Sequence, residues 1–424
     1  MTAPDVERAI HTVFRMESAR LIAGLTRLLR DVGRAEELAQ DALVAALEHW
    51  PEQGVPDNPG AWLMATSKRR AIDELRRHKR LTRKHEELGA ELEADALADG
   101  ESLARRLEQQ LDEPIADDLL RLVFISCHPV LSMESRVALT LRLLGGLTTD
   151  EIARAFLVPE PTIAQRIVRA KRTLAEQRVP FELPNGPELA ERLSSVLGVI
   201  YLIFNEGYAA TAGDDLMRPG LCEDALRLGR ILAELARLEP EVHGLVALME
   251  LQASRSAARV GPNGAAILLL EQNRSRWDQL LIRRGLAALA RAEQLGGAEG
   301  PYALQAAIAA CHARAQSAEE TNWQRIAALY ETLSAQTGSP IVELNRAVAV
   351  SMADGPAAGL QILDALYDEP ALASYHLLPS VRGDLLEKLG RRTEAAEQFD
   401  RAASLTKNER EREVLLGRAA ACRR

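Results

Sequence analysis

The sequence predicts an all-α protein, and three observations support this fold class. Aromatic residues make up only 4% of the 424 residues, whereas Ala, Leu, Arg and Glu, which favour helices, are abundant. Apolar residues make up 47% of the chain and recur at spacings of three and four, as on one face of a helix. Gly, Pro and Asn separate these segments. We therefore expect two small helical domains joined by an acidic linker, followed by a larger helical domain with repeats.

Charge is distributed unevenly along the chain, although its total is only -9. Residues 68–84 hold nine Lys or Arg and two acids, a net +7, and residues 161–178 hold five against one, a net +4. Between them, residues 86–118 hold twelve acids and two arginines, a net -10. An acidic chain repels a polyanion as a whole, but each basic run has the sign that attracts nucleic-acid phosphates. The alternative for each run is a solvated helix face.

The first predicted domain covers residues 1–88. Asp31 is placed to cap a helix whose apolar stripe is Ala39, Leu43, Leu47 and Trp50. The other side of this helix carries polar residues, namely Glu36, Glu37, Gln40 and Asp41.

Residues 51–60, with three prolines and two glycines, predict a loop that ends near Asn58 or Pro59. A second helix begins near Gly60, with Ala61, Ala65, Ile72 and Leu75 expected to face inward. Its remaining surface is rich in basic residues, and backbone phosphates are the obvious counter-charge.

Residues 89–118 form the predicted linker. They are acidic, hold few bulky apolar residues and are interrupted by Gly100 and Pro114, so they cannot bury enough surface for a domain. A flexible tether is the simplest interpretation.

The second predicted domain, residues 119–182, has the pattern of a helix-turn-helix. One helix stops at Gly145 and Gly146, and a capping box starting at Thr148 begins the next. After a short turn, Pro161 opens a helix with Ile163, Ile167, Ala170 and Leu174 inward and a basic outer face. The second helix of such a pair enters the DNA major groove.

The third predicted domain, residues 186–424, follows a segment rich in proline. Two of its stretches align with an offset of 35 to 37 residues, matching Gly355 with Gly390, Ala358 with Ala395 and Ala365 with Ala402. This spacing of small residues resembles tetratricopeptide repeats. Asn205 to Tyr208 predict the end of a helix, with Gly207 at its cap.

Several classes of protein are disfavoured. The four cysteines lie far apart without a CxxC, and the pairs Cys127-His128 and Cys311-His312 are too close for both residues to bind one metal, so we expect no metal and no cofactor. No phosphate-binding loop or catalytic motif occurs, so we do not expect an enzyme. The apolar run from Leu193 to Phe204 is too short for a membrane span, and the start lacks the apolar core of a signal peptide. We expect a cytoplasmic protein without membrane contact.

Three strings of residues resemble one family. They are AEELAQDALVAALEHW (35–50), AWLMATSKRRAIDELRR (61–77) and GLTTDEIARAFLVPEPTIAQRIVRAKRTL (146–174), which are similar to regions 2 and 4 of bacterial sigma factors of the extracytoplasmic-function class. The resemblance implies that core RNA polymerase and promoter DNA are the partners, and that the linker threads the basic channel of the polymerase.

The resemblance also assigns roles to residues. Those implied to contact core polymerase are Glu37, Gln40 and Asp41. Those implied to take the minus-10 element are Asp57, Asn58, Trp62, Lys68, Arg69, Arg70, Asp73, Arg76 and Arg77. Thr162, Gln165, Arg166 and Arg169 are implied to contact base edges or adjacent phosphates at minus-35, and Lys171 and Arg172 to bind phosphate. Arg69 stands where the family usually has Asn, so the minus-10 sequence that this chain reads cannot be taken from the family. For Trp62, a core anchor is the alternative.

The whole chain resembles the subgroup with a C-terminal tetratricopeptide-like extension, which implies modulation of the sigma factor in cis by an unidentified protein or ligand. One rival interpretation is a helix-turn-helix regulator with a tetratricopeptide-like sensor domain. Another is a repeat scaffold that binds only proteins. Because the acidic residues outside the two basic runs repel DNA, we expect the chain to bind its promoter only together with polymerase.

Overall fold

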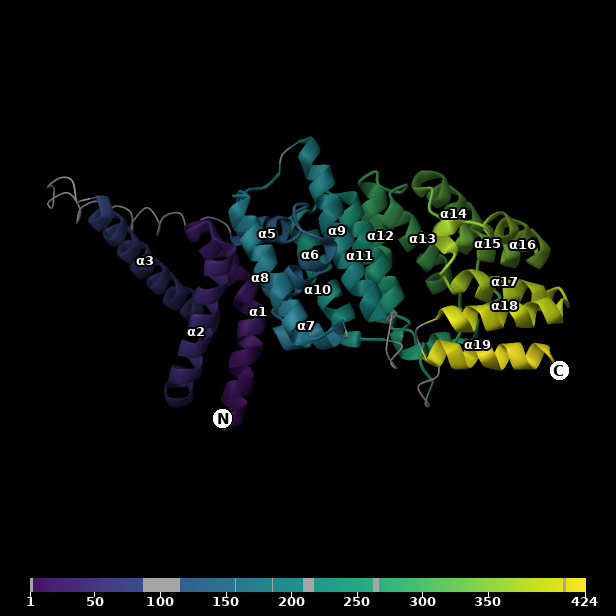
Figure 1. Ribbon diagram of the computed structural model, residues 1–424, viewed down its shortest axis with the longest axis horizontal. Helices are drawn as coiled ribbons and strands as arrows, with labels where there is room; N and C mark the ends of the chain where they lie inside the picture. The colour runs from purple at the N-terminus through teal and green to yellow at the C-terminus, as the bar shows by residue number, and fades with distance from the viewer. Residues whose placement is uncertain are drawn as a thin grey trace. The chain divides into compact units, whose positions relative to one another are not determined.

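The computed structural model describes residues 3–86, 115–156, 158–184, 186–208, 217–261, 267–406 and 409–424. Every element in these ranges is an α-helix or a short 3-10 helix, as predicted (Figure 1). The chain forms two compact units, unit 1 (Met1–Val199) and unit 2 (Ile200–Arg424). The predicted acidic linker lies outside the described residues as far as residue 114.

Unit 1 is built on two groups of helices. The helices of the first group are α1 (Ala3–Leu29), α2 (Val32–Gln53) and α3 (Pro59–Glu86). Those of the second group are α5 (Ile115–Ser126), α6 (Met133–Leu143), α7 (Thr149–Ala155) and α8 (Glu160–Glu176). The two groups pack together, because α1 contacts α5 and α6, and α2 contacts α8.

The start of α2 is as predicted, but the predicted stripe is only partly right. The Asp31 side chain accepts a hydrogen bond from the Arg34 amide at 3.0 Å and caps the helix. Ala39 and Trp50 are buried, whereas Leu43 and Leu47 are only half-buried. Four alanines of α2, which packs on α1, are buried instead, namely Ala35, Ala42, Ala45 and Ala46. Small side chains let packed helices approach closely, which fits the partial exposure of the larger Leu43 and Leu47.

The predicted inward face of α3 is wrong at its start. Ala61 and Ala65 are exposed, and Leu63, Ser67 and Ala71 are buried. The Ser67 hydroxyl donates to the Leu63 carbonyl at 2.8 Å, so this polar side chain is buried with its hydrogen bond made. Alanine tolerates either side of a helix, which is why it did not fix the phase of this one.

The helix-turn-helix follows the prediction closely. Helix α6 ends before Gly145, and Gly146 has a φ of 69°, a conformation that glycine adopts readily. The Thr148 hydroxyl and the Glu151 carboxylate form a capping box at the start of α7. In α8 the four residues predicted to face inward are buried, and Pro161 lies in the first turn.

The boundary between the units falls within α9 (Pro187–Tyr208), later than the proline-rich segment at which the third domain was predicted to begin. The first part of α9 belongs to unit 1. Arg192 donates to the Phe124 carbonyl at 3.0 Å, and the Ser195 hydroxyl donates to the Cys127 carbonyl at 2.7 Å. Proline and glycine mark a break between helices, but these contacts join the next helix to the unit before it.

Unit 2 continues with helices and short 3-10 turns. The α-helices are α10 (Pro219–Leu235), α11 (Pro240–Ala253), α12 (Gln279–Gln294), α13 (Pro301–Arg314), α14 (Trp323–Thr337), α15 (Pro340–Asp354), α16 (Pro356–Ala365), α17 (Leu377–Lys388), α18 (Arg392–Leu405) and α19 (Glu409–Cys422). The 3-10 helices are η1 (Ser256–Ala258), η2 (Leu269–Glu271), η3 (Arg274–Arg276) and η4 (Pro370–Leu372).

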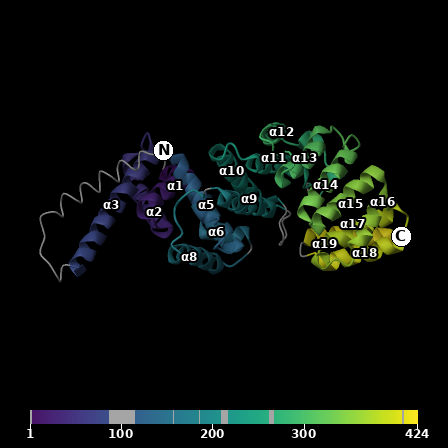
Figure 2. The same ribbon diagram turned by 90° about the horizontal axis from the view of Figure 1, so that it is seen from above.

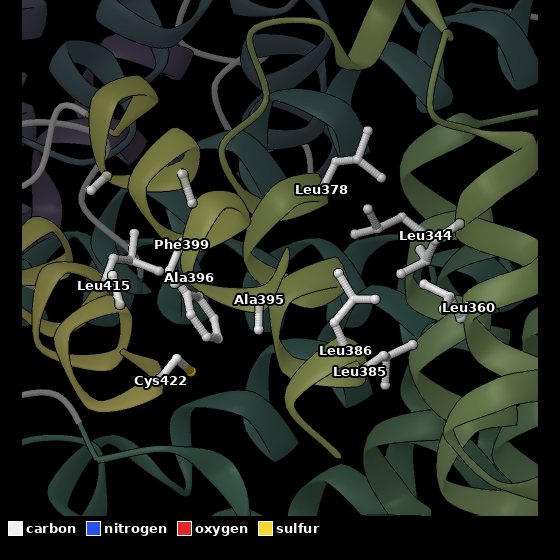
Figure 3. Close-up of a cluster of buried hydrophobic side chains, with 14 of the residues drawn as sticks. Leu344, Leu360, Leu378, Leu385, Leu386, Ala395, Ala396, Phe399, Leu415 and Cys422 are labelled. Carbon is white, nitrogen blue, oxygen red and sulfur yellow. The ribbon is translucent and has the colours of Figure 1, made fainter. Parts of the chain in front are cut away.

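The two aligned stretches of unit 2 form two helical hairpins, α15–α16 and α17–α18, which lie side by side (Figure 2). Gly355 and Gly390 make the turns, with φ values of 98° and 76°. Side chains from the two hairpins share one core with side chains of α19, and Phe399 is fully buried in this core (Figure 3).

The alignment of small residues within these hairpins was one position out of register. Ala365 is exposed, whereas its predicted partner Ala402 is fully buried. The buried residues of α16 are Gly359, Leu360 and Leu363, and those at the corresponding places in α18 are Ala395, Ala396 and Phe399. The sequence alignment paired alanines because they are alike in size. The buried positions instead pair Gly359 with Ala395 and Leu363 with Phe399.

Candidate nucleic-acid and polymerase interface

The outer face of α2 carries the residues expected to bind polymerase. Glu37 and Asp41 have exposed side chains, and Gln40 is half-buried. Glu37 pairs with Arg34, and the Asp41 carboxylate lies 3.4 Å from Arg70. Exposed pairs of this kind contribute little free energy, about 0–1 kcal/mol, so either carboxylate can exchange its partner at low cost.

The loop before α3 and the start of that helix present the first group of expected DNA-binding residues. Asp57 and Asn58 are exposed, and the Asn58 side chain accepts from the Ala61 amide at 3.1 Å, which caps the helix. Trp62 is half-buried, with its ring 5.3 Å from that of the buried Trp50 in an edge-on contact. The Trp62 ring therefore anchors α3 to α2 and also keeps part of its surface in solvent.

The basic residues of α3 differ in their surroundings. Arg69 is exposed, Lys68 is half-buried, and Arg70 donates to the Asp41 carbonyl at 3.1 Å. Arg70 and Asp41, one expected to face DNA and the other polymerase, thus contact each other. The side chains of Arg76 and Arg77 lie outside the described residues.

The outer face of α8 presents the second group. Gln165 and Arg169 are exposed, Thr162 and Arg166 are half-buried, and Arg172 is exposed and paired with Glu176 at 2.7 Å. With Val168, which is 64% exposed, several of these side chains line a shallow groove along the helix. The lining residues are Ala164, Gln165, Val168, Arg169, Arg172, Thr173 and Glu176.

Sequence reasoning missed Val168. An apolar side chain between exposed basic residues of such a helix can contact a thymine methyl group. Val168 lies three residues after Gln165 and four before Arg172, and this spacing places all three on one face of the helix, which could have indicated it.

Lys171 lies in a different environment from the rest of α8. Its ammonium pairs with the Glu36 carboxylate of α2, and Arg142 of α6 donates to the same carboxylate at 2.6 Å. The Glu36 side chain is only 5% exposed. The expectation that Glu36 lies on the polar side of α2 is therefore wrong, because two cations from later helices neutralise it at the edge of the buried face.

A second buried cluster of charges joins the two groups of helices. Asp118 of α5 is 2% exposed and lies 3.2 Å from Arg27 of α1 and 2.8 Å from Arg121. Together with the Glu36 cluster, it holds the helix-turn-helix against the first three helices. Removing one partner from such a buried cluster leaves an uncompensated charge.

Comparisons with known families match both groups of helices. The family model of sigma-70 region 2 matches residues 13–81, and that of sigma-70 region 4 matches residues 121–174. The ECF RNA polymerase sigma factor SigK of Mycobacterium ulcerans is 30% identical over 40% of this chain and 85% of its own length. A SigK of a further Mycobacterium strain, KMS, is 28% identical over 38% of this chain and 79% of its own length.

The chain belongs to the ECF sigma factors. It is a promoter-directing sigma factor with a C-terminal extension. Sigma factor families bind core RNA polymerase and promoter DNA, and they are not enzymes.

The extension of this sigma factor matches other proteins as well. Residues 192–293 match a family of unknown function, DUF6596. An uncharacterized protein of Rhizobium meliloti is 44% identical over 91% of this chain and 89% of its own length, so it shares the extension.

The residues Asn205 to Tyr208 of this matched segment are not a simple helix cap. Gly207 lies inside α9, and a Cβ atom there would lie 2.6 Å from the Cys222 amide nitrogen of α10. Glu206 is buried and pairs with Arg218, and the Tyr208 carbonyl and hydroxyl accept hydrogen bonds from two arginines. The prediction of a glycine cap is therefore wrong, because the glycine permits a close approach of two helices.

Two features are absent from the part of the chain that the structure describes. No helix there is long and apolar enough to cross a membrane. No group of three or more His, Cys, Asp or Glu side chains there is arranged to hold a metal ion.

Proposed function

We propose that this sigma factor contacts core polymerase through the outer face of α2, at Glu37, Gln40 and Asp41. The exposure of the Glu37 and Asp41 side chains supports this assignment. The adjoining loop and α3 then take the minus-10 element through Asp57, Asn58, Trp62 and the basic residues that follow. The chain itself contributes no catalytic residue.

We further propose that α8 binds the minus-35 element. The observation that carries this proposal is the exposed Gln165, Arg169 and Arg172 on the second helix of a capped helix-turn-helix. Arginine can donate two hydrogen bonds to guanine, and glutamine can pair with adenine. The acidic linker, 89–118, is proposed to enter the basic channel of the polymerase.

Run-off transcription with purified core polymerase tests this function. The sigma factor should direct initiation from its promoter, and a variant carrying Glu37→Lys and Asp41→Lys should lose initiation while keeping its fold by circular dichroism. If the wild-type chain directs no specific initiation while a control sigma factor does, the proposal fails.

The C-terminal extension is proposed to modulate the sigma factor in cis, through a protein or ligand that binds to it. Run-off transcription by a chain of residues 1–199, compared with the full chain, tests this role. Ending the chain at 199 rather than at 185 keeps the contacts that Arg192 and Ser195 make within unit 1. Equal activity of the two chains, at equal occupancy of polymerase and with the extension's ligand present, would contradict the proposal.

A further inference from the structure

Three arginines of unit 2 gather around two aromatic rings. The Arg255 guanidinium carbon lies 5.8 Å from the ring centres of both Tyr208 and Trp277. Arg259 lies 3.8 Å from the Tyr208 ring, and Arg274 lies 5.1 Å from the Trp277 ring. Arg255 is therefore the middle member of a row of cations, which we call the arginine row.

Two members of the arginine row are held by the ends of helices. Arg259 donates to the carbonyl of Tyr208, the last residue of α9. Arg274 donates to the carbonyls of His312 and Ala315, at the end of α13, at 2.6 and 2.8 Å. Carbonyls at a helix C-terminus attract cations, so these two arginines have a structural role as well.

Arg255 has no such role. It donates through one terminal nitrogen to the Tyr208 hydroxyl, at 2.8 Å, and to the Gln252 side chain. A guanidinium has five N–H donors, and within the described part of the chain only one nitrogen of Arg255 makes hydrogen bonds, so its other donors have no partner there. Among the residues that the structure describes, none of Arg255, Arg259 and Arg274 forms an ion pair with a carboxylate.

The row is an unfavourable arrangement of like charges. Burial lowers the pKa of Arg259 and of Arg274, and in both cases the charge of Arg255 lowers it further. Burial and the same two neighbours, Arg255 and Arg274, lower the pKa of His312 to about 4, so this ring is neutral at pH 7. An anion placed here would relieve the repulsion.

The carboxylates that act on the arginine row do not supply that anion. The charge of Glu411 stabilises Arg259, and the charges of Glu319 and Glu320 stabilise Arg274, but in the described part of the chain none of them forms an ion pair with these arginines. The Glu411 carboxylate lies 3.2 Å from His376 instead. Glu319 is fully exposed, where solvent screens its charge.

Two buried polar atoms beside the arginine row also lack a partner in the described part of the chain. They are Nε1 of Trp277, whose residue is 3% exposed, and Nδ1 of His312, whose residue is 7% exposed. The indole N–H can only donate, and buried donors are ordinarily satisfied. An oxygen of a bound molecule is a suitable acceptor.

We propose that the arginine row is a binding site for a small, multiply charged oxyanion, such as a phosphate ester or a polycarboxylate. Arg255 donates to it directly, and Arg259 and Arg274 stabilise its charge from either side. Oxyanions accept paired hydrogen bonds from arginine at short distances, so a half-buried row of three selects for them. The site concerns the extension alone and does not depend on transcription by unit 1.

Calorimetric titration of the full chain with pyrophosphate and with citrate, at constant ionic strength, tests the site. We expect binding of at least one of them, and Arg255→Gln should weaken it by about tenfold or more, because hydrogen bonds to charged groups are among the strongest. Tighter binding of pyrophosphate points to a phosphate ester, and tighter binding of citrate to a polycarboxylate. Both results support the site.

Two control variants locate the binding. Arg284→Gln removes an exposed arginine of α12 and should leave the affinity unchanged. Arg172→Gln removes a cation from the DNA-facing side of α8, and it too should have no effect. Loss of binding in Arg172→Gln, with binding kept in Arg255→Gln, would place the anion on α8 and overturn the proposal. No binding of either probe to the wild-type chain would do the same.

A third variant guards against misfolding. If circular dichroism shows that Arg255→Gln is unfolded, Arg255→Lys keeps the charge but loses the paired donors, and an unchanged affinity in that variant counts against the site. Hydrogen exchange adds a measurement without substitution. Pyrophosphate should slow exchange in residues 252–259 and 274–278 of the wild-type chain, and no change there would contradict the proposal.

Discussion

Glu36 and Glu37 are adjacent in the sequence but have opposite environments. The Glu36 side chain is 5% exposed and is bonded to Arg142 and Lys171, whereas that of Glu37 is 62% exposed and, among the residues that the structure describes, pairs only with Arg34. A carboxylate buried between two cations loses much more than an exposed one when its charge is removed. The two positions therefore form a matched pair of tests.

Glu36→Gln should lower the free energy of unfolding by about 1–3 kcal/mol, because it weakens hydrogen bonds between charged groups and leaves two half-buried cations without their counter-charge. Urea unfolding measures the change. Glu37→Gln is the control and should change the free energy by less than about 0.5 kcal/mol. Equal effects of the two substitutions would contradict the placement of Glu36.

Gly207 and Gly198 form a second matched pair, on one helix. A Cβ atom at 207 would meet the α10 backbone at 2.6 Å, whereas one at 198 would meet nothing within 4 Å. Gly207→Ala should therefore destabilise the chain by about 1–3 kcal/mol through overpacking. Gly198→Ala should stabilise it by about 0.5–1 kcal/mol, because alanine favours a helix. Thermal unfolding followed by circular dichroism measures both changes, and a stabilising Gly207→Ala would rule out the close approach.

At the scale of elements, we expect α8 to make two kinds of contact with DNA. Arg166 is half-buried near the start of the helix, whereas Arg172 is exposed and, among the described residues, pairs with Glu176 alone. Contacts to base edges specify the sequence, whereas contacts to phosphates do not depend on it.

Arg166→Ala should weaken polymerase-dependent promoter binding by about 1–3 kcal/mol and relax the preference at one minus-35 position. Arg172→Ala should weaken binding evenly across promoter variants and reduce its salt dependence. A binding series over single-base promoter variants distinguishes them. If Arg166→Ala leaves the sequence preference unchanged, Arg166 does not read a base.

Local signals in the sequence were sufficient for some elements and not for others. The Asp31 cap, the turn at Gly146 and the buried face of α8 depend on residues within a few positions of each other, and all three were predicted. The pairing of Glu36 with Lys171 depends on residues far apart in the sequence, so no periodicity could indicate it. The prediction of which side of α3 faces inward was wrong for a different reason, because alanine and serine are compatible with either face of a helix.

At the scale of the whole molecule, unit 1 holds regions 2 and 4 in direct contact. In a promoter the centres of the minus-10 and minus-35 elements are about 25 base pairs apart, or about 85 Å along B-DNA at 3.4 Å per base pair. Helices that touch through Glu36 and Lys171 cannot bind both elements at that distance. We therefore expect promoter binding to separate α2 from α8 and to release Lys171 from Glu36, which would free it for the phosphate contact that the resemblance implied.

Energy transfer between dyes on α2 and α8 should report this separation. With Glu48→Cys and Ala175→Cys labelled and Cys311 replaced by Ser, transfer should be high in the free chain and fall when polymerase and promoter are added. Glu36→Gln should lower transfer in the free chain as well. Unchanged transfer on adding polymerase and promoter would show that unit 1 does not open.

The order of synthesis gives the Glu36 contact a further consequence. Residue 36 leaves the ribosome long before its partner at 171, and at about 5–20 residues per second the delay is roughly 7–27 s. During that time α2 can pack on α1, but the Glu36 carboxylate lacks Lys171, region 4 is incomplete and the extension has not been made. We expect the first helices to be open to polymerase while the rest is being translated, and ribosome-bound chains arrested before and after residue 171 should differ in the proteolytic protection of α2.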